Sequence, residues 1–577
     1  MNQQKDRSGY PFHPSHEPRI GYFSMEIALD PTISTYSGGL GVLAGDTVRS
    51  AADLEIPFVA VTLAHRQGYF RQKLDAVGNQ TEEDDKWLPE KQVERVKETV
   101  DLTIEGRHVR VGAWRYLCKG VTGHIVPVYL LDTALPENSD YDQTLTSQLY
   151  GGDSRYRLCQ ETVLGMGGVA ILAALGHTNI QSYHMNEGHS ALLVLGLLQK
   201  RKGDAGLGSV TVEDIESIRR QCIFTTHTPV PAGHDQFPRD LMRQVLGDEA
   251  ASVLNVTQCC PDERLNMTFL ALRCSHFING VAMRHGEISQ DMFPNYPIRA
   301  ITNGVHAATW VSPPMQSLFD DHIPHWRRDN LLLRYVMGIS LEALRKAHLQ
   351  AKQALFERVR SATGIHLDEA VFTIGFARRA TAYKRADLLF HSLDRLRGIA
   401  RNVGPFQIVM GGKAHPRDEG GKDLIRRVFQ AARDLEDIIK VVYVENYEMT
   451  WGKYLCSGVD LWLNTPKRPH EASGTSGMKA AMNGVPSLSV LDGWWVEGHI
   501  EGVTGWSIGD DGDTATDDTK ESVSLYDKLE RVILPLHYNL TDGYTKVMRS
   551  AIALNGAYFN TQRMVFQYAV DAYAAVN

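Results

Sequence analysis

The residues best suited to chemistry lie in a run of small side chains that ends in a lysine, Glu471-Ala472-Ser473-Gly474-Thr475-Ser476-Gly477-Met478-Lys479. The run leads directly into a helix-forming stretch, where backbone N–H groups and the helix N-terminus can approach an anion closely. Lys479 falls near the first helical turn, so its amine is directed toward the same place. The pattern fits a lysine that forms a Schiff base with a phosphate-bearing cofactor, or a phosphate loop whose lysine is only a counter-charge.

A second group of charges directly follows a predicted buried strand over 371–377, in the segment Arg378-Arg379-Ala380-Thr381-Ala382-Tyr383-Lys384-Arg385. An arginine fork and a lysine point charge both suit phosphate, so four cations at the end of a strand predict an anion site. The alternative is a solvated basic face without a ligand. A glycine-rich turn, Tyr36-Ser37-Gly38-Gly39-Leu40-Gly41, precedes helical sequence and fits either a second anion-binding loop or an ordinary tight turn.

Two histidine motifs also stand at predicted strand ends. Glu187 and His189 follow one strand, and His227 follows the next, with Pro229 and Pro231 stopping any helix there. Isolated histidines are more often structural than catalytic, and these lack the spacing of metal ligands. The sequence therefore predicts no metal site and leaves the role of these histidines open.

The elements that must position these residues alternate between short apolar runs and helical patterns, which predicts an α/β protein with largely parallel sheets. Strands are predicted over 57–63, 223–226 and 298–302, and then over 371–377, 406–410, 438–444 and 459–463. A helix is predicted over 341–360 with Ser340 as its N-cap. The stretch 311–330 contains a Pro-Pro pair and many polar residues and has no clean period, which indicates the start of a connection between two lobes, 1–310 and 311–577. A final helix over about 544–575 is expected to pack back on the first lobe.

The bulk composition narrows the classes of partner. The chain has 577 residues and a formal net charge of -8, which favours neither nucleic acid nor an anionic membrane. No stretch approaches the roughly 20 apolar residues of a membrane helix, and the start has no signal core. Seven scattered cysteines lack metal spacing or a disulfide framework, although the adjacent Cys259 and Cys260 leave a redox pair open. We expect a reduced, cytoplasmic enzyme.

The lysine segment, together with LDGWWVEG over 491–498, resembles the cofactor-lysine region of the glycogen, starch and maltodextrin phosphorylases. The resemblance begins near Tyr22 and continues to the C-terminus through motifs in the family's order. It implies two Rossmann-like lobes of the GT-B glycosyltransferase type with an active-site cleft between them. Residues 1–310 would form the glucan side, and 311–577 the side of the cofactor, pyridoxal 5'-phosphate. The chain is shorter than the well-studied members, so we expect a catalytic core without their regulatory regions.

The resemblance also implies a role for each motif. The catalytic residues it suggests are Lys479, which would carry the cofactor, with Arg379, Lys384, His227 and Glu471. Further cofactor contacts would come from Thr475, Ser476, Arg378, Tyr447 and Gly39. Arg378 stands where many relatives have lysine, and Ala28 replaces a tyrosine common beside the cofactor. Phosphate and sugar would be bound by Gly38, Gly39, Leu40, His227, Asn303, Tyr383, Glu471, Ser473 and Gly474, with Glu187 and His189 lining the adjacent pocket.

The activity that the resemblance implies is phosphorolysis of α-1,4-glucan by inorganic phosphate, giving α-glucose 1-phosphate with retention. The partners are then glycogen or maltodextrin and phosphate. A homodimer is the assembly common among relatives, although the sequence does not give the oligomeric state. Two alternatives remain: a retaining nucleotide-sugar glycosyltransferase of the same fold, and a glucan-binding protein without catalytic activity.

Overall fold

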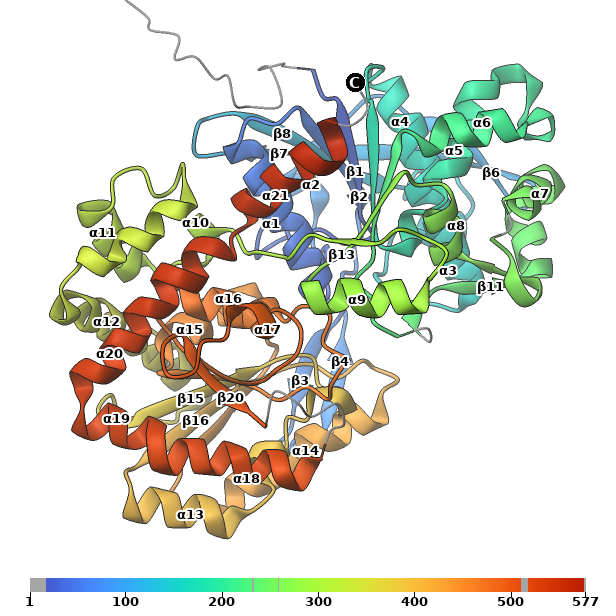
Figure 1. Ribbon diagram of the computed structural model, residues 1–577. Coiled ribbons are helices and arrows are strands. Elements are labelled where there is room, and N and C mark those ends of the chain that lie inside the picture. The colour runs from blue at the N-terminus through green and yellow to red at the C-terminus, as the bar shows by residue number, and fades with distance from the viewer. Residues whose placement is uncertain (1–16, 231–232, 258, 510–516, 575–577) are drawn as a thin grey trace, which may run out of the picture.

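The larger of the two main sheets contains the N-terminal strand. The computed structural model describes residues 17–230, 233–257, 259–509 and 517–574 (Figure 1). Within these ranges ten strands form the first sheet, in the upper half of Figure 1. Its order is β14 (Arg299–Ala300), β13 (Phe277–Gly280), β10 (Cys222–Thr225), β9 (Ser182–Asn186), β1 (Ile20–Phe23), β2 (Phe58–Leu63), β8 (Ile125–Asp132), β7 (Arg107–Lys119) and β5 (Glu94–Arg95), with β6 (Val100–Ile104) on β7.

The second sheet lies in the lower half of Figure 1 and is parallel throughout. Its order is β17 (Val441–Val444), β16 (Phe406–Gly411), β15 (Phe372–Ala377), β18 (Leu461–Asn464), β19 (Ser487–Val490) and β20 (Gly505–Ile508). Two small antiparallel pairs complete the strands: β3 (Arg71–Leu74) with β4 (Gln80–Glu83), and β11 (Gln236–Pro238) with β12 (Arg264–Asn266).

Helices connect the strands and pack against them. Those before the second sheet are α1 (Gly39–Asp53), α2 (Pro89–Gln92), α3 (Ser154–Thr162), α4 (Gly168–Ala174), α5 (Leu193–Lys202), α6 (Val212–Arg219), α7 (Arg239–Val256), α8 (Met267–Arg273), α9 (Met283–Met292), α10 (Ala307–Trp310), α11 (Pro313–His322) and α12 (Leu341–Thr363). The later ones are α13 (Leu393–Asn402), α14 (Glu419–Asp434), α15 (Met449–Gly458), α16 (Thr475–Met482), α17 (Trp495–Gly498), α18 (Asp518–Lys528), α19 (Leu534–Asn539), α20 (Thr541–Ser550) and α21 (Thr561–Tyr568). No helix in the described ranges is both long and apolar enough to cross a membrane.

The predicted α/β class is confirmed, because parallel strands dominate both sheets and helices connect them. The strand of 371–377 is β15, whose six residues are all buried, as expected for a central parallel strand. The predicted helix over 341–360 is α12. Ser340 caps it by accepting a hydrogen bond from the N–H of Ala343, and Gly364 ends it in the left-handed conformation.

The prediction of an irregular stretch over 311–330 is wrong in part. The helix α11 occupies its first half, beginning at Pro313 after Ser312. Proline is tolerated in the first helical turn, where its missing N–H would have no partner within the helix. The Pro-Pro pair that suggested a break therefore marks the start of a helix.

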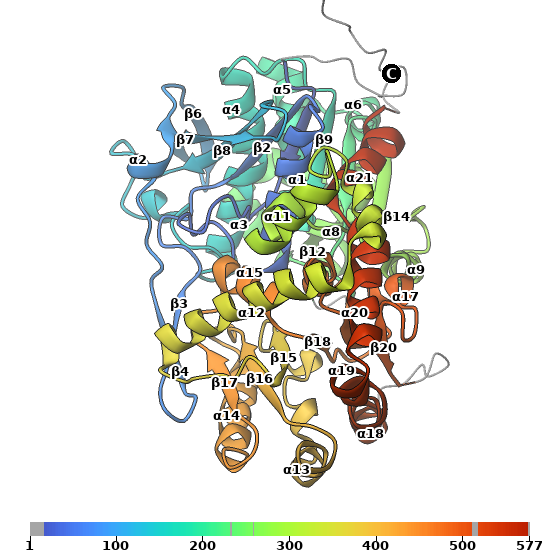
Figure 2. The ribbon, with the colours of Figure 1, turned by 90° about the vertical axis from the view of Figure 1, so that its left-hand side faces the viewer.

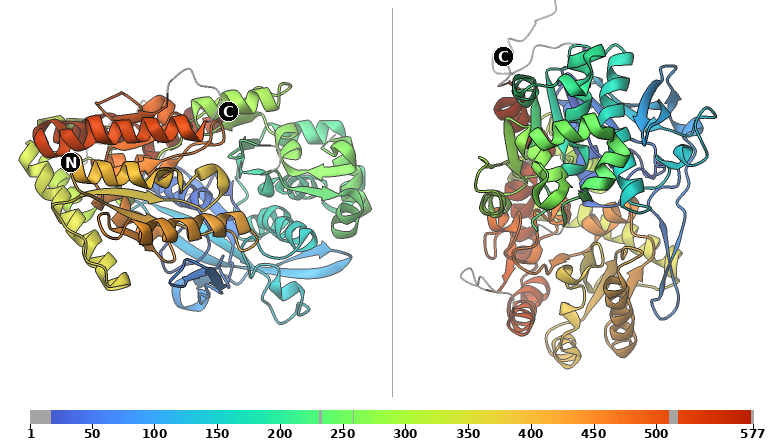
Figure 3. Two further views of the ribbon diagram at one scale, coloured as in Figure 1. Left: turned by 90° about the horizontal axis from the view of Figure 1, so that it is seen from below. Right: turned by 90° about the vertical axis from the view of Figure 1, so that its right-hand side faces the viewer.

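The C-terminal helices span both halves of the molecule. They run from α18 in the lower half to α21 in the upper half, in red in Figure 1 and in the right-hand view of Figure 3. The helix α21 packs against α1. Its Met564, Val565 and Tyr568 belong to an apolar cluster that also includes residues of β1 and β2. The chain end thus links the first sheet to the second.

Candidate active site

A cavity of about 360 Å³ brings together most of the residues that the sequence predicts for the site. Segments that follow strands of the first sheet, including the start of α1, contribute Gly38, Gly39, Leu40, His227 and Asn303 to its wall. Segments of the second sheet contribute Arg378, Arg379, Tyr383, Lys384, Tyr447, Glu471, Ser473, Gly474, Thr475, Ser476 and Lys479. The carboxyl ends of β10, β15 and β18 precede several of these segments, which is where ligands bind in open parallel sheets.

Lys479 occupies the inner part of this cavity. Its Nζ lies 3.7 Å from the ring centroid of Trp310 and makes no hydrogen bond or ion pair with a described residue. Burial lowers the pKa of Lys479, which favours the neutral amine that attacks a carbonyl carbon. The Trp310 indole is held by its Nε1, which donates to Oδ2 of the buried Asp46 at 2.7 Å.

The walls around Lys479 fit a flat aromatic ring that carries a phosphate. Gly452 lines the cavity between two aromatic side chains: a Cβ placed there would be 3.3 Å from the Tyr447 hydroxyl and 3.5 Å from the Trp310 ring. Gly474 adopts the left-handed conformation as N-cap of α16, and it lines the cavity with Thr475 and Ser476, so the N-terminus of that helix, where an anion can bind, lies at the cavity. The Ser473 Oγ is buried without a partner in the described chain and lines the same cavity. These residues fit pyridoxal 5'-phosphate.

The Arg379 guanidinium faces the glycine-rich turn. The Arg379 Nη2 lies 3.3 Å from the place where a Cβ on Gly38 would be. Arg379 makes no hydrogen bond or ion pair within the described ranges, so its donors remain available for an anion. Gly38 is also the N-cap of α1, whose first N–H groups open at this point. Two elements from different sheets therefore converge on one anion position.

A buried ion triad lies beside this position. Oε2 of Glu471 accepts from Arg378 Nη2 at 2.5 Å and from Lys384 Nζ at 2.6 Å. Burial alone would raise the pKa of Glu471, but the two cations outweigh it and lower the pKa to about 2. The carboxylate is thus ionised at neutral pH. The sequence did not indicate that Glu471 would contact Arg378 and Lys384 directly.

Lys384 should make anion binding depend on pH. Burial, and then the neighbouring charge of Arg378, lower the pKa of Lys384 to about 7. The ammonium, which attracts anions, is present below this pKa and is lost as pH rises through it. We expect sulfate binding to weaken above pH 7, by up to about tenfold per pH unit, more steeply than in Lys384→Arg, whose guanidinium stays charged. The measurement is the dissociation constant of sulfate as a function of pH, and equal pH slopes in the two proteins would contradict this.

His227 lies in the wall of the first cavity as a neutral imidazole. Burial, and then the neighbouring histidines, lower its pKa well below the usual value. Its Nε2 lies 2.6 Å from Oδ1 of Asn186, and its backbone N–H donates to Oε2 of Glu187 at 2.7 Å. The Asn303 Oδ1 in the same cavity is buried and has no partner among the described residues. Unpaired buried polar atoms of this kind suit the hydroxyl groups of a sugar.

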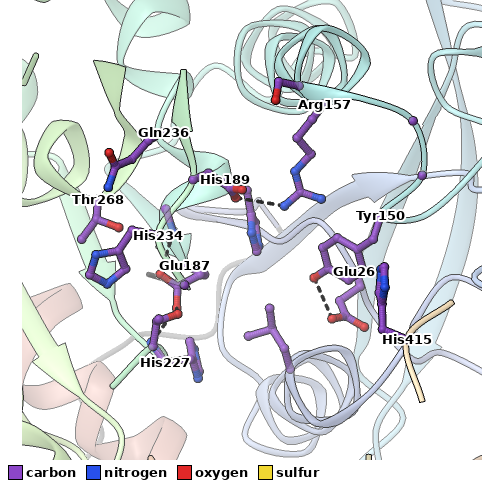
Figure 4. Close-up of a pocket in the computed structure, with 18 of the residues that line it drawn as sticks. Glu26, Tyr150, Arg157, Glu187, His189, His227, His234, Gln236, Thr268 and His415 are labelled. Atoms are coloured by element: carbon purple, nitrogen blue, oxygen red, sulfur yellow. Dashed lines mark hydrogen bonds and ion pairs between the residues drawn. The ribbon is translucent and has the colours of Figure 1, made fainter. Parts of the chain in front are cut away.

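Glu187 and His189 lie in a second cavity of about 710 Å³ (Figure 4). The two cavities share four wall residues, Leu40, Tyr69, His227 and Arg379, so they adjoin. Figure 4 shows the Tyr150 hydroxyl directed at Glu26, to which it donates at 2.8 Å. The same carboxylate accepts the backbone N–H of Ser37 at 2.6 Å, which ties the glycine-rich turn to the second cavity.

Several wall residues were missed by the sequence analysis. Asp46, which holds the wall residue Trp310 from behind, is a buried acid in α1 beside small and apolar residues, and this was the available signal. Trp310, Gly452 and Glu26 carry no comparable signal, because each gains its role only from a partner distant in the sequence. The described residues contain no group of three or more histidine, cysteine or acidic side chains arranged to hold a metal ion.

Comparison with known proteins gives one consistent result. Residues 234–505 match the model of the carbohydrate phosphorylase family. The chain is 37% identical to the maltodextrin phosphorylase of Thermococcus litoralis, over 97% of this chain and 71% of that protein. It is 32% identical to the glycogen phosphorylase of Aquifex aeolicus, over 98% and 87%, and 34% identical to that of Mycobacterium tuberculosis, over 96% and 70%.

Proposed function

The chain belongs to the carbohydrate phosphorylase family, and from this we propose that it is an α-glucan phosphorylase. It uses inorganic phosphate to remove glucose from the non-reducing end of an α-1,4-glucan, releasing α-glucose 1-phosphate. The observation that carries the proposal is the joint placement of the Lys479 amine and the Arg379 guanidinium in one cavity. Neither side chain has a hydrogen-bond or ion-pair partner in the described chain.

The proposed architecture is two Rossmann-like lobes of the GT-B type with the active site between them. Support comes from the first cavity, which takes its wall from loops of both sheets. We place the boundary near residue 310, with the last helices returning to the first lobe. We also propose a cytoplasmic location and a homodimer; the seven cysteines, all in thiol form, support a reducing compartment.

The proposed cofactor is pyridoxal 5'-phosphate attached to Lys479. Tyr447 and Trp310 would contact its ring, and Thr475, Ser476 and Gly39 would lie near it with Arg378. When bound, it supplies a phosphate group with a second pKa of about 6, which exchanges a proton near neutral pH.

The chain's own residues bind and orient the substrates. Arg379, Lys384 and the N–H of Gly39 would hold inorganic phosphate by charge and by hydrogen bonds, beside Gly38, whose own N–H donates to Oε2 of Glu26 at 3.3 Å. Phosphate fixed there can protonate the glycosidic oxygen and then attack the sugar carbon from the same face, which gives retention. Glucose would be oriented by polar side chains of the wall, with the backbone of two further residues; the side chains are Glu471, Ser473, Tyr383, His227 and Asn303, and the backbone is that of Gly474 and Leu40.

The adjoining cavity suits the remaining glucan chain. It is larger, it opens from the first cavity at His227, and polar groups such as Glu187 and His189 line it. The His189 Nε2 is buried with no partner among the described residues, as expected of a group that meets a hydroxyl. Glucose and the following sugar unit would therefore lie on either side of His227.

The direct test compares phosphate-dependent release of glucose 1-phosphate from maltose, longer maltodextrins and glycogen. We expect product that requires both phosphate and glucan, from protein whose near-ultraviolet or visible spectrum shows bound cofactor. A nucleotide-sugar glycosyltransferase would lack the cofactor band and would require a nucleotide donor instead. A binding protein without activity would release no product, and either result would overturn the proposal.

A further inference from the structure

A hairpin from the first half of the chain reaches across to the second sheet. Its strands β3 and β4 extend downward in Figure 2 to lie beside β16, β17 and α14. Several hydrogen bonds join the two sides, between positions more than 300 residues apart. The hairpin is therefore a contact between the two halves on the phosphate-binding side of the cavity.

Two glutamines at the centre of this contact are buried. Gln72 is 0% exposed and Gln80 is 6% exposed. Nε2 of Gln72 donates to Oε1 of Gln80 at 2.8 Å and to the carbonyl of Gly412 at 2.9 Å. Gln80 donates from Nε2 to the carbonyl of Ala414 at 2.9 Å, and its Oε1 accepts the N–H of Ala414 at 3.0 Å. Such a satisfied buried network fixes its partners closely, because each broken bond leaves a buried group unpaired.

The segment held by these amides supports the anion-binding arginines. The N–H of Arg378 donates to the Gly411 carbonyl at 3.1 Å, and that of Ala380 donates to the Lys413 carbonyl at 2.9 Å. A Cβ on Gly412 would lie 1.9 Å from the Arg378 carbonyl oxygen, so the two backbones are in direct contact. Leu74 of the hairpin packs with Ala380 and Ala414 in a small apolar cluster. Arg379 lies between the two residues that this segment binds.

We propose that Gln72 and Gln80 are positioning residues for phosphate: through the segment 411–414 they hold the Arg379 guanidinium opposite Gly38. They touch no substrate and act only through the backbone around Arg379. The inference rests on the proposed function, because it assigns Arg379 to inorganic phosphate. It adds that a hairpin of the first half determines the phosphate affinity of residues in the second half.

An exposed ion pair on the same hairpin provides a control for the buried glutamines. Lys73 pairs with Glu445 at 3.2 Å, but these side chains are 42% and 40% exposed. Surface ion pairs of this type contribute little, because water and salt screen them. Lys73 is next to Gln72 on the same strand, so a change there disturbs the same hairpin without touching the buried amides.

The experiment compares Gln72→Met with Lys73→Gln in protein loaded with cofactor. We expect Gln72→Met to raise the KM for phosphate about tenfold or more, because Gly412 loses its donor and Asn446 loses the acceptor of its N–H. The KM for maltodextrin and the cofactor content should stay within about twofold of wild type. Lys73→Gln should resemble wild type in all three. If Gln72→Met does not fold, Gln80→Met tests the same network.

A double-mutant cycle with Arg379→Lys separates positioning from general stability. If the amides act through Arg379, Gln72→Met should raise the phosphate KM much less in the Arg379→Lys background than in wild type. Additive effects, or an equal rise in the KM for maltodextrin, would overturn the inference. An unchanged phosphate KM in Arg379→Lys alone would instead refute the proposed phosphate site, so the two failures can be distinguished.

Discussion

Lys479→Ala is expected to give a protein that binds no cofactor and has no measurable turnover. The covalent link to Lys479 Nζ would be lost, and with it the cofactor whose phosphate group would exchange a proton in the reaction. We expect phosphorolysis to fall by at least about 10³-fold, comparable to loss of a general acid. The measurements are the absorption spectrum, cofactor released by acid, and the rate with phosphate and maltodextrin.

Two further variants control for charge and for folding. Lys479→Arg keeps a cation beside Trp310 but cannot form the link, so it should be as inactive as the alanine variant. Lys346→Ala removes an exposed lysine from α12 and should behave as wild type. Full activity of Lys479→Ala without an added amine would refute the role given to this residue.

Arg379→Ala is expected to have the second largest effect, mainly through phosphate. A charge-assisted contact to a developing or bound anion is worth about 3 kcal/mol, so kcat/KM for phosphate should fall by about 10²-fold or more. The melting temperature should change little, because Arg379 has no hydrogen-bond or ion-pair partner in the described ranges that its removal would leave unpaired. Steady-state kinetics with varied phosphate and a thermal melt measure both effects.

Arg385 gives the opposite pattern and serves as the comparison. Its guanidinium is buried, donates to the Thr465 carbonyl at 2.9 Å and pairs with Glu521. Arg385→Ala should therefore destabilise the fold, since it leaves a buried carboxylate with one cation fewer. If Arg379→Ala left phosphate kinetics unchanged, the anion position opposite Gly38 would be wrong.

Many of the cavity's wall residues could be predicted because they follow the carboxyl ends of strands, which lie together at one edge of a parallel sheet. Arg379 follows a buried apolar strand, and parallel strands direct their carboxyl ends to one edge. The run before Lys479 combines small residues with a helix start, which is a local pattern that the sequence displays directly. The α/β class followed for the same reason, from apolar runs alternating with helical periods.

The remaining features depend on pairs that no local pattern reveals. Asp46 and Trp310 are 264 positions apart, and Gln72 and Asn446 are 374 apart, yet both pairs are hydrogen-bonded. The ion triad of Glu471 was missed because the sequence suggests separate roles for its members. Arg378 and Lys384 were expected near phosphate groups and Glu471 near the sugar, and only the distances show that they form ion pairs. The helix α11 is not evident from the sequence, because two prolines in succession suggest a break and only the structure shows that they begin a helix.

The most direct test of the central claim is a crystal structure of the protein loaded with cofactor and grown in phosphate. We predict electron density continuous with Lys479 Nζ, extending past Trp310 to a phosphate group. A second tetrahedral anion should lie beside it, contacted by Arg379, Lys384 and the backbone N–H of Gly39. Density that left Lys479 unmodified in fully loaded protein, or placed the second anion away from Arg379 and Lys384, would contradict the account.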